Sequence, residues 1–291
     1  MATVHVGHSP DPDDAFMFYA LTYGKFDTTP ESYEHHLLDI ELLNQKALKG
    51  EYEVTALSFH AYAYVADQYD LLPHGASFGD GYGPIVVTRQ FSGGDPRAWL
   101  EGKRIAVPGM RTSAYLSLQI YARGLGDAKV NVPNFETVVV PFDQIMESIA
   151  AGKFDGGLLI HEGQLTYHEG PSGSLQKVVD LGEWWKQETG LPLPLGGNGI
   201  RKNLGSERIK LVSKHLYESI KFGLAHRAEA LGYAMKYGRG LEVQKADKFV
   251  GMYVNDYTLD YGEKGREAVR RFLAEGAAKD LIKIKVSPKW V

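Results

Sequence analysis

The chain has 291 residues, 44% of them hydrophobic and 23% charged, which is ordinary for a globular protein with one large or two medium domains. Its 32 basic and 36 acidic residues give a formal net charge of −4, with no basic tract of the kind that binds nucleic acid or membrane surfaces. It has no cysteine, which excludes disulfides, thiolate chemistry and cysteine-ligated metals.

The N-terminal stretch lacks the basic and apolar regions of a signal peptide. The sequence has no run of about 18 apolar residues, the length that a membrane-spanning helix needs. These features predict a cytoplasmic protein with neither a membrane nor a nucleic acid as partner. We expect a monomer or homodimer that binds a small molecule.

Residues 1–90 predict alternating strands and helices. Strands are expected at 3–7, 36–40, 54–57 and 84–88, and helices at 15–24, 41–49 and 58–66. The glycine-rich stretch 75–83 predicts a loop. Asp13 or Asp14 would cap the first helix and Ser58 the third, because their oxygens accept the free N–H groups of a first helical turn.

The next hundred residues repeat this pattern before the chain becomes helical. Strands are expected at 104–107, 137–140, 158–160 and 178–181, and helices from 112 or 113 to 123 and from 143 to 152. Pro192 and Pro194 exclude a helix over 191–197 and predict an extended crossing segment. Helices then follow at 206–226, 227–237, 243–253 and 263–279.

This order of elements predicts an α/β protein with a bilobal, type II periplasmic-binding-protein-like fold and a central cleft. The first lobe would comprise residues 1–90 and 197–291, and the second residues 91–196. Ligands of such proteins bind between the lobes, where closure excludes water.

The strand at 158–160 carries the leading catalytic candidate. It is a short apolar run that suits a strand buried on both faces of a parallel sheet, and it ends at His161 and Glu162. Ligands of open α/β sheets bind beyond the carboxyl ends of the strands. A neutral imidazole is a suitable proton acceptor at neutral pH, so His161 is a candidate general base. Glu162 ranks second because neighbours on a strand face opposite ways.

Three junctions between a loop and a helix predict the binding residues. They are Ala56-Leu57-Ser58, Thr112-Ser113-Ala114, and Asp13-Asp14 at the start of the first helix, with Asp14 as the binding candidate. A helix N-terminus offers free N–H groups and partial positive charge, so two of them could hold a carboxylate. The alternative is that these serine, threonine and aspartate side chains are helix caps alone.

The sequence predicts neither a metal site nor an organic cofactor. His35 and His36 adjoin on an expected strand and would point to opposite faces. The acidic cluster at Asp11, Asp13 and Asp14 lacks the glycine and distal glutamate of a calcium loop, and the chain has no phosphate-binding glycine motif.

Several motifs, in order along nearly the whole chain, resemble one family. Residues 8–16 resemble the Ser-Pro-x-Pro-Asn/Asp-Asp signature of the 1,4-dihydroxy-6-naphthoate synthase family, which acts in the futalosine route to menaquinone. The likeness continues through the stretches 57–58, 83–87, 107–115, 160–162, 184–185, 189–196, 253–255 and 262–263.

The resemblance implies the bilobal fold and a lyase that converts cyclic dehypoxanthinyl futalosine, a carboxylate substrate, into 1,4-dihydroxy-6-naphthoate without a cofactor. The family's general base falls on His161, and its Leu-Ser contact segment falls on Ala56 to Ser58. Its Thr-Ala pair falls on Ser113 and Ala114, so a methyl group is missing here. A base would remove a proton, and retro-aldol-like cleavage toward an aromatic product would follow.

Two other functions stay open from the sequence. One is chorismate dehydratase of the same pathway, which shares the fold. The other is a non-enzymatic binding protein for a small carboxylate, and the expected lack of an export signal argues against it.

Overall fold

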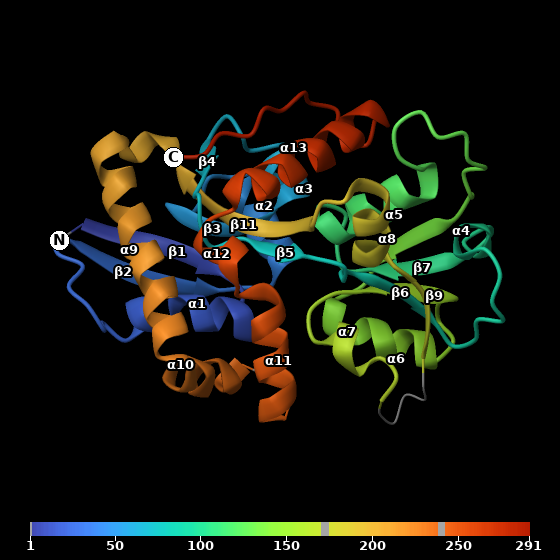
Figure 1. Cartoon of the computed structure of the whole chain (residues 1–291), viewed down its shortest axis with the longest axis horizontal. Coiled ribbons are helices and arrows are strands. Elements are labelled where there is room, and N and C mark those ends of the chain that lie inside the picture. The colour runs from blue at the N-terminus through green and yellow to red at the C-terminus, as the bar shows by residue number, and fades with distance from the viewer. Residues whose placement is uncertain (1, 170–174, 238–241) are drawn as a thin grey trace.

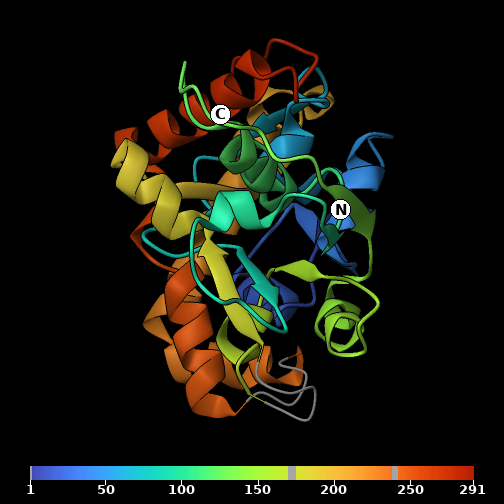
Figure 2. The same ribbon diagram turned by 90° about the vertical axis from the view of Figure 1, so that its right-hand side faces the viewer.

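The structure is a computed structural model that describes residues 2–169, 175–237 and 242–291. It has two α/β lobes side by side, each built on its own sheet (Figure 1). The bilobal α/β fold predicted from the sequence is therefore confirmed. Figure 2 views the molecule along its length, with the green and yellow elements of the second lobe in front.

The sheet of the first lobe is mixed, with the strand order β2-β1-β3-β11-β4 and with β5 also paired to β11. β1 is parallel to β2 and β3, whereas β11 runs antiparallel to β3, β4 and β5. The bounds are β1 Ala2–His8, β2 Glu31–Leu37, β3 Val54–Ser58, β4 Tyr69–Leu71, β5 Ser77–Gly79 and β11 Leu193–Arg201.

The sheet of the second lobe has the order β10-β6-β9-β7-β8. β9 lies at its centre, parallel to β7 and antiparallel to β6, and all four of its residues are buried. The sheet is thus mixed and not parallel, although β9 is buried as predicted. The bounds are β6 Ile85–Thr88, β7 Arg104–Val107, β8 Glu136–Val139, β9 Gly156–Leu159 and β10 Gln176–Asp180.

Helices cover both faces of the first sheet. α1 packs against α9, α10 and α11 on one side, and α13 contacts β11 on the other (Figure 1). The bounds are α1 Pro12–Thr22, α2 Ile40–Ala47, α3 Phe59–Tyr62, α9 Ser206–Ala225, α10 Arg227–Ala234, α11 Val243–Tyr253, α12 Asp256–Leu259 and α13 Gly262–Ala278.

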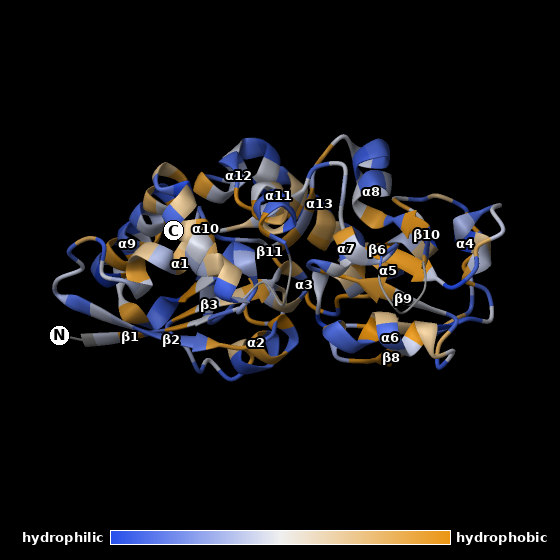
Figure 3. Cartoon of the chain, turned by 90° about the horizontal axis from the view of Figure 1, so that it is seen from below, coloured by the Kyte–Doolittle hydropathy of each residue, from blue (hydrophilic) through white to orange (hydrophobic). Residues whose placement is uncertain are grey.

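Side-chain caps begin three of the second-lobe helices in the described chain, namely α4, α5 and α8. The Thr112 hydroxyl accepts a hydrogen bond from Tyr115 N (3.1 Å), and the Asp180 carboxylate accepts from Gly182 N (2.8 Å). Apolar residues concentrate on the strands that these helices cover (Figure 3). The bounds are α4 Pro96–Trp99, α5 Ser113–Arg123, α6 Ile145–Ala150, α7 Gly163–Thr166 and α8 Leu181–Thr189.

One apolar core connects the lobes. A single cluster of buried side chains includes Leu57 and Phe59 of the first lobe and Leu116 and Leu158 of the second. The α8 backbone also packs directly against the segment between β5 and β6. Gly182 has no room for a side chain there, because an added Cβ would lie 1.9 Å from the Tyr82 carbonyl oxygen. The lobes are therefore packed together beside their cleft.

The proposed division of the chain at 90 and 196 stays a prediction. β6 at Ile85–Thr88 already belongs to the second sheet, and β11 begins at Leu193 within the first. Sheet membership thus favours crossing points a few residues earlier than those proposed.

Several local predictions are wrong. The strand expected at 36–40 lies earlier, as β2 at Glu31–Leu37. The chain has left the sheet by Asp39, whose side chain caps α2 by accepting hydrogen bonds from the backbone N–H groups of Glu41 and Leu42. The predicted loop 75–83 contains β5, which extends the sheet beside β11. The helix expected at 58–66 is only α3, since turns replace it after Tyr62.

Among the described residues, no helix is long and apolar enough to cross a membrane.

Trp185 tests the packing of the core. Its ring is fully buried against Phe272, and its Nε1 donates a hydrogen bond to Pro192 O (3.1 Å). We expect Trp185→Ala to lower the free energy of unfolding by ~3–5 kcal/mol, measured by urea denaturation. The neighbouring Trp184 is only partly buried, so Trp184→Ala should cost less than half as much. Equal losses in the two variants would contradict this assignment of the core.

Candidate active site

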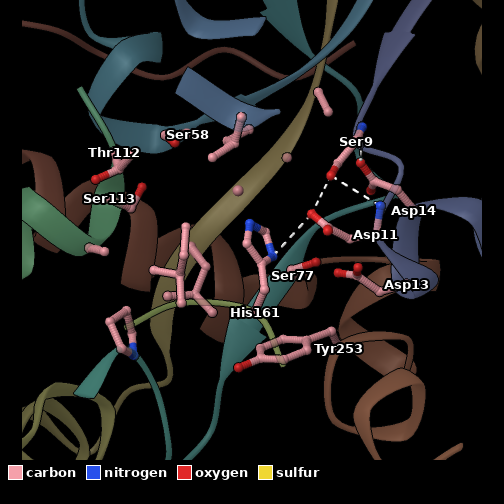
Figure 4. A pocket seen from close by; sticks show the side chains of 18 of the residues that line it. Ser9, Asp11, Asp13, Asp14, Ser58, Ser77, Thr112, Ser113, His161 and Tyr253 are labelled. Atoms are coloured by element: carbon pink, nitrogen blue, oxygen red, sulfur yellow. Dashed lines mark hydrogen bonds and ion pairs between the residues drawn. The ribbon is translucent and has the colours of Figure 1, made fainter. Parts of the chain in front are cut away.

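A cavity lies between the lobes, and residues of both lobes line it (Figure 4). We call it the interlobe cavity. The eight residues predicted from the sequence all line it: Asp14, Ala56, Leu57, Ser58, Thr112, Ser113, Ala114 and His161. Glu162 and the two tryptophans of α8 are not among its lining residues in the described part of the chain. The individual roles of the eight residues remain predictions.

His161 stands two residues after β9, with its backbone in the left-handed region at a φ of 54°. That conformation is uncommon for a residue with a Cβ, and strained backbone conformations cluster at functional sites. His161 Nδ1 lies 3.2 Å from Asp11 Oδ2, and the ring packs edge-on against Phe142. The ring is therefore held from two sides.

Asp11 reaches His161 from the other lobe. It is the N-cap residue of α1, at the end of the loop that leaves β1, and its side chain is 1% exposed. The same carboxylate accepts a hydrogen bond from the Ser9 hydroxyl (Figure 4). In the sequence Asp11 stands out only as part of an acidic cluster, because no linear pattern indicates that β1 and β9 end opposite each other.

This contact determines which nitrogen of His161 can act as a base. A carboxylate oxygen only accepts hydrogen bonds, so the proton of a neutral imidazole belongs on Nδ1. Nε2 then carries the lone pair. It is buried and has no hydrogen-bond partner among the described residues. Nε2 is therefore available to a ligand in the interlobe cavity.

Gln164 and Tyr253 form a second contact between the lobes at the cavity wall. The Gln164 side chain, on α7, is hydrogen-bonded to the Tyr253 hydroxyl of α11 at 2.9 Å. With its amide oxygen turned toward donors, Gln164 also accepts a hydrogen bond from the backbone N–H of His161 (3.2 Å). Burial raises the pKa of Tyr253 well above its usual range, so the phenol stays neutral.

Two further carboxyl groups lie in the first turn of α1, where Asp13 is buried next to His161 and Asp14 is half-buried. Burial raises the pKa of Asp13 to about 8, with Asp14 and Asp11 adding repulsion and His161 opposing the shift. Burial also raises the pKa of Asp14 to about 7, although a hydrogen bond from Ser9 N favours its charged form. Asp13 is therefore largely protonated at neutral pH and can act as a proton donor.

The opposite wall of the interlobe cavity carries hydroxyl groups. Ser58 N donates to Asn44 Oδ1 (2.9 Å), and the Asn44 amide donates to Ser58 Oγ (3.1 Å). Ser113 Oγ accepts from His60 N at 3.4 Å across the lobes. Asn44 thus fixes the end of β3. No pattern in the sequence predicts this contact.

The predicted caps must be corrected at two of three junctions. Asp11 is the N-cap residue of α1, so Asp13 and Asp14 lie inside its first turn and do not cap it. Ser58 makes no capping hydrogen bond, because its side chain is held by Asn44. Thr112 caps α5 as predicted.

Two lobes that enclose a cavity lined by hydroxyl groups, carboxyl groups and one imidazole define an α/β protein of the type II periplasmic-binding-protein-like fold. Solved structures agree with this class. The alkanesulfonate-binding protein of Xanthomonas axonopodis pv. citri superimposes with a TM-score of 0.69 at 14% identity, covering 100% of this chain and 98% of its own. A likeness at that identity concerns the fold alone.

Closer comparisons identify the family. The Menaquinone biosynthesis family matches residues 4–278. Proteins named 1,4-dihydroxy-6-naphtoate synthase from Thermus thermophilus and Streptomyces coelicolor are 40% and 35% identical, over 100% and 96% of this chain and 100% and 95% of their own. A crystal structure of an Archaeoglobus fulgidus protein is 47% identical with a TM-score of 0.86, covering 96% of this chain and 98% of its own. The chain therefore belongs to the menaquinone biosynthesis family.

The raised pKa of Asp13 predicts a pH dependence of stability. Between the ordinary pKa of 3.8 and about 8, the unfolded chain has already lost this proton, whereas the folded chain still binds it. Stability should therefore fall as the pH rises through this window, and Asp13→Asn should flatten the decline. The measurement is the thermal midpoint at several pH values. Asp67→Asn, at an exposed position, serves as the control. Parallel curves for wild type and Asp13→Asn would contradict the prediction.

Proposed function

We propose that this chain is a carbon–carbon lyase that converts cyclic dehypoxanthinyl futalosine into 1,4-dihydroxy-6-naphthoate and a sugar-derived fragment. The names of the two full-length relatives support the pathway and the product. The observation that carries the proposal is the His161–Asp11 pair, which lines the interlobe cavity. Asp11 holds Nδ1, and Nε2, which has no hydrogen-bond partner among the described residues, is left for a ligand.

His161 would act as the general base. Asp11 orients the ring and stabilises the imidazolium that forms when Nε2 takes a proton from the substrate. Cleavage then follows in a retro-aldol manner, driven by formation of the aromatic product. Because Asp11 and His161 come from different lobes, the pair is complete only when the lobes are together, and water is then excluded from the reacting groups.

Asp13 is the group that we assign as the acid. It lines the interlobe cavity, and its Oδ1 is buried without a hydrogen-bond partner in the described part of the chain. As the carbon–carbon bond breaks, the deprotonated hydroxyl becomes a carbonyl group, and a neutral carboxyl at Asp13 can return a proton to the carbanion or enolate that is left. The end of β3 at Ser58 and the N-terminus of α5 at Ser113 would bind the substrate carboxylate and its hydroxyl groups.

Incubation with candidate substrates tests the proposal against its alternatives. The purified protein is incubated separately with the cyclic futalosine and with chorismate, and naphthoate absorbance and chorismate loss are followed. We expect naphthoate from the cyclic futalosine and no loss of chorismate. Chorismate loss would indicate a dehydratase. Binding of either compound without turnover would indicate a binding protein.

His161→Gln tests the base. The amide keeps a polar group of similar reach but cannot accept a proton at neutral pH, so we expect kcat to fall by about 10²–10⁴-fold. Substrate affinity, measured by calorimetry, should change little. Turnover near the wild-type rate would remove His161 from the mechanism.

Ser58→Ala and Ser113→Ala test the hydroxyl wall. Each variant loses a hydrogen bond to the substrate, so we expect KM to rise about five- to tenfold while kcat stays within a few-fold of wild type. Ser117→Ala is the matched control. Ser117 is buried one turn further along α5, and its hydroxyl donates a hydrogen bond to the backbone carbonyl oxygen of Ser113. Unchanged KM values in both test variants would show that the two serines have only structural roles.

A further inference from the structure

Three potential metal ligands lie together on β1 and β2, away from the interlobe cavity. His5 pairs with Glu34 and Gly7 with His36 in the parallel register of the two strands. Paired residues and alternate residues share one face of a sheet, so His5, Glu34 and His36 all project to the same side. His35 projects to the other side, where it contacts His8.

The distances between these side chains match the needs of a metal ion. His5 Nδ1 and His36 Nε2 share a hydrogen bond at 3.0 Å, which an ion would replace. Each lies 3.6 Å from Glu34, His5 from Oε2 and His36 from Oε1. In a tetrahedral zinc site with bonds of ~2.05 Å, neighbouring ligand atoms are ~3.3 Å apart. The three observed distances bracket that value. Small side-chain rotations would therefore be enough to bring all three ligands onto one ion.

The surroundings favour binding at this position. The His36 ring is stacked on Tyr52, with centroids 4.8 Å apart and planes 18° from parallel, which restricts its orientation. The His5, Glu34 and His36 side chains are 40%, 58% and 30% exposed, so an ion can enter and a water molecule can complete its shell. Two imidazoles with one carboxylate suit Zn²⁺ and neighbouring transition ions, whereas Mg²⁺ and Ca²⁺ prefer all-oxygen sites.

We propose that His5, Glu34 and His36 form a binding site for a divalent transition-metal ion of the zinc type. The ion would link the edge strand β2 to β1, the strand that leads into the loop carrying Ser9 and Asp11. In the sequence, His36 adjoins only His35, which points to the other face of the strand, so no metal site is predicted there. His5 is distant in the sequence because it comes from another strand. The proposal is independent of the proposed reaction, since it concerns ion binding and stability.

The first experiment measures binding to the untagged full-length protein after chelator treatment. Zn²⁺ is titrated by calorimetry, and Co²⁺ is added to record ligand-field absorption. We expect one equivalent of Zn²⁺ to bind, four-coordinate Co²⁺ bands to develop, and Mg²⁺ to produce no heat. At a zinc concentration about 100 times Kd, the thermal midpoint should rise by about 5 °C.

Three variants locate the site. Glu34→Gln removes a ligand from an exposed position and His36→Asn removes one from a half-buried position, so both should fold and bind Zn²⁺ at least about tenfold more weakly, without the Co²⁺ bands. His168→Gln is the matched control, because His168 is an exposed histidine that pairs, among the described residues, with a single carboxylate, Glu169, at 3.4 Å. It should bind as wild type does. The proposal is overturned if wild type binds no stoichiometric ion, or if Glu34→Gln and His36→Asn bind it as tightly as wild type.

Discussion

The contact between the Asp11 carboxylate and His161 Nδ1 is the interaction on which the proposed chemistry depends. It joins a loop that follows β1 in one lobe to the residues that follow β9 in the other. Neither lobe alone could form this pair, because Asp11 follows a strand of one lobe and His161 follows a strand of the other. The same approach of the lobes that forms the interlobe cavity therefore also orients the imidazole of His161.

This arrangement concentrates acidic groups where water is scarce. Asp11, Asp13 and Asp14 are all within the α1 N-terminal region, and two of them have raised pKa values because burial disfavours their charged forms. The chain thus places a carboxyl group that retains its proton beside an imidazole that can take one. A proton donor and a proton acceptor side by side are what one site needs to supply both an acid and a base near neutral pH.

The elements with strong local signals could be predicted from the sequence. β7 at Arg104–Val107 and α11 at Val243–Tyr253 have the predicted bounds, since apolar spacing and flanking breakers are local properties. His161 could be found because it follows a buried strand. Asp11, Asn44, Gln164 and Tyr253 could not be assigned to the site, because each acts through a partner distant in the sequence. The cap expected at Ser58 failed for the same reason, since Asn44 competes for its hydroxyl.

The most direct test of the account is the single-turnover rate of Asp11→Asn with saturating cyclic dehypoxanthinyl futalosine. An amide keeps the size of the carboxylate but loses its charge, so it no longer stabilises the imidazolium formed at His161. The account predicts a rate constant lower by about 10²-fold or more, with substrate affinity largely retained. A rate constant equal to that of the wild type would contradict it.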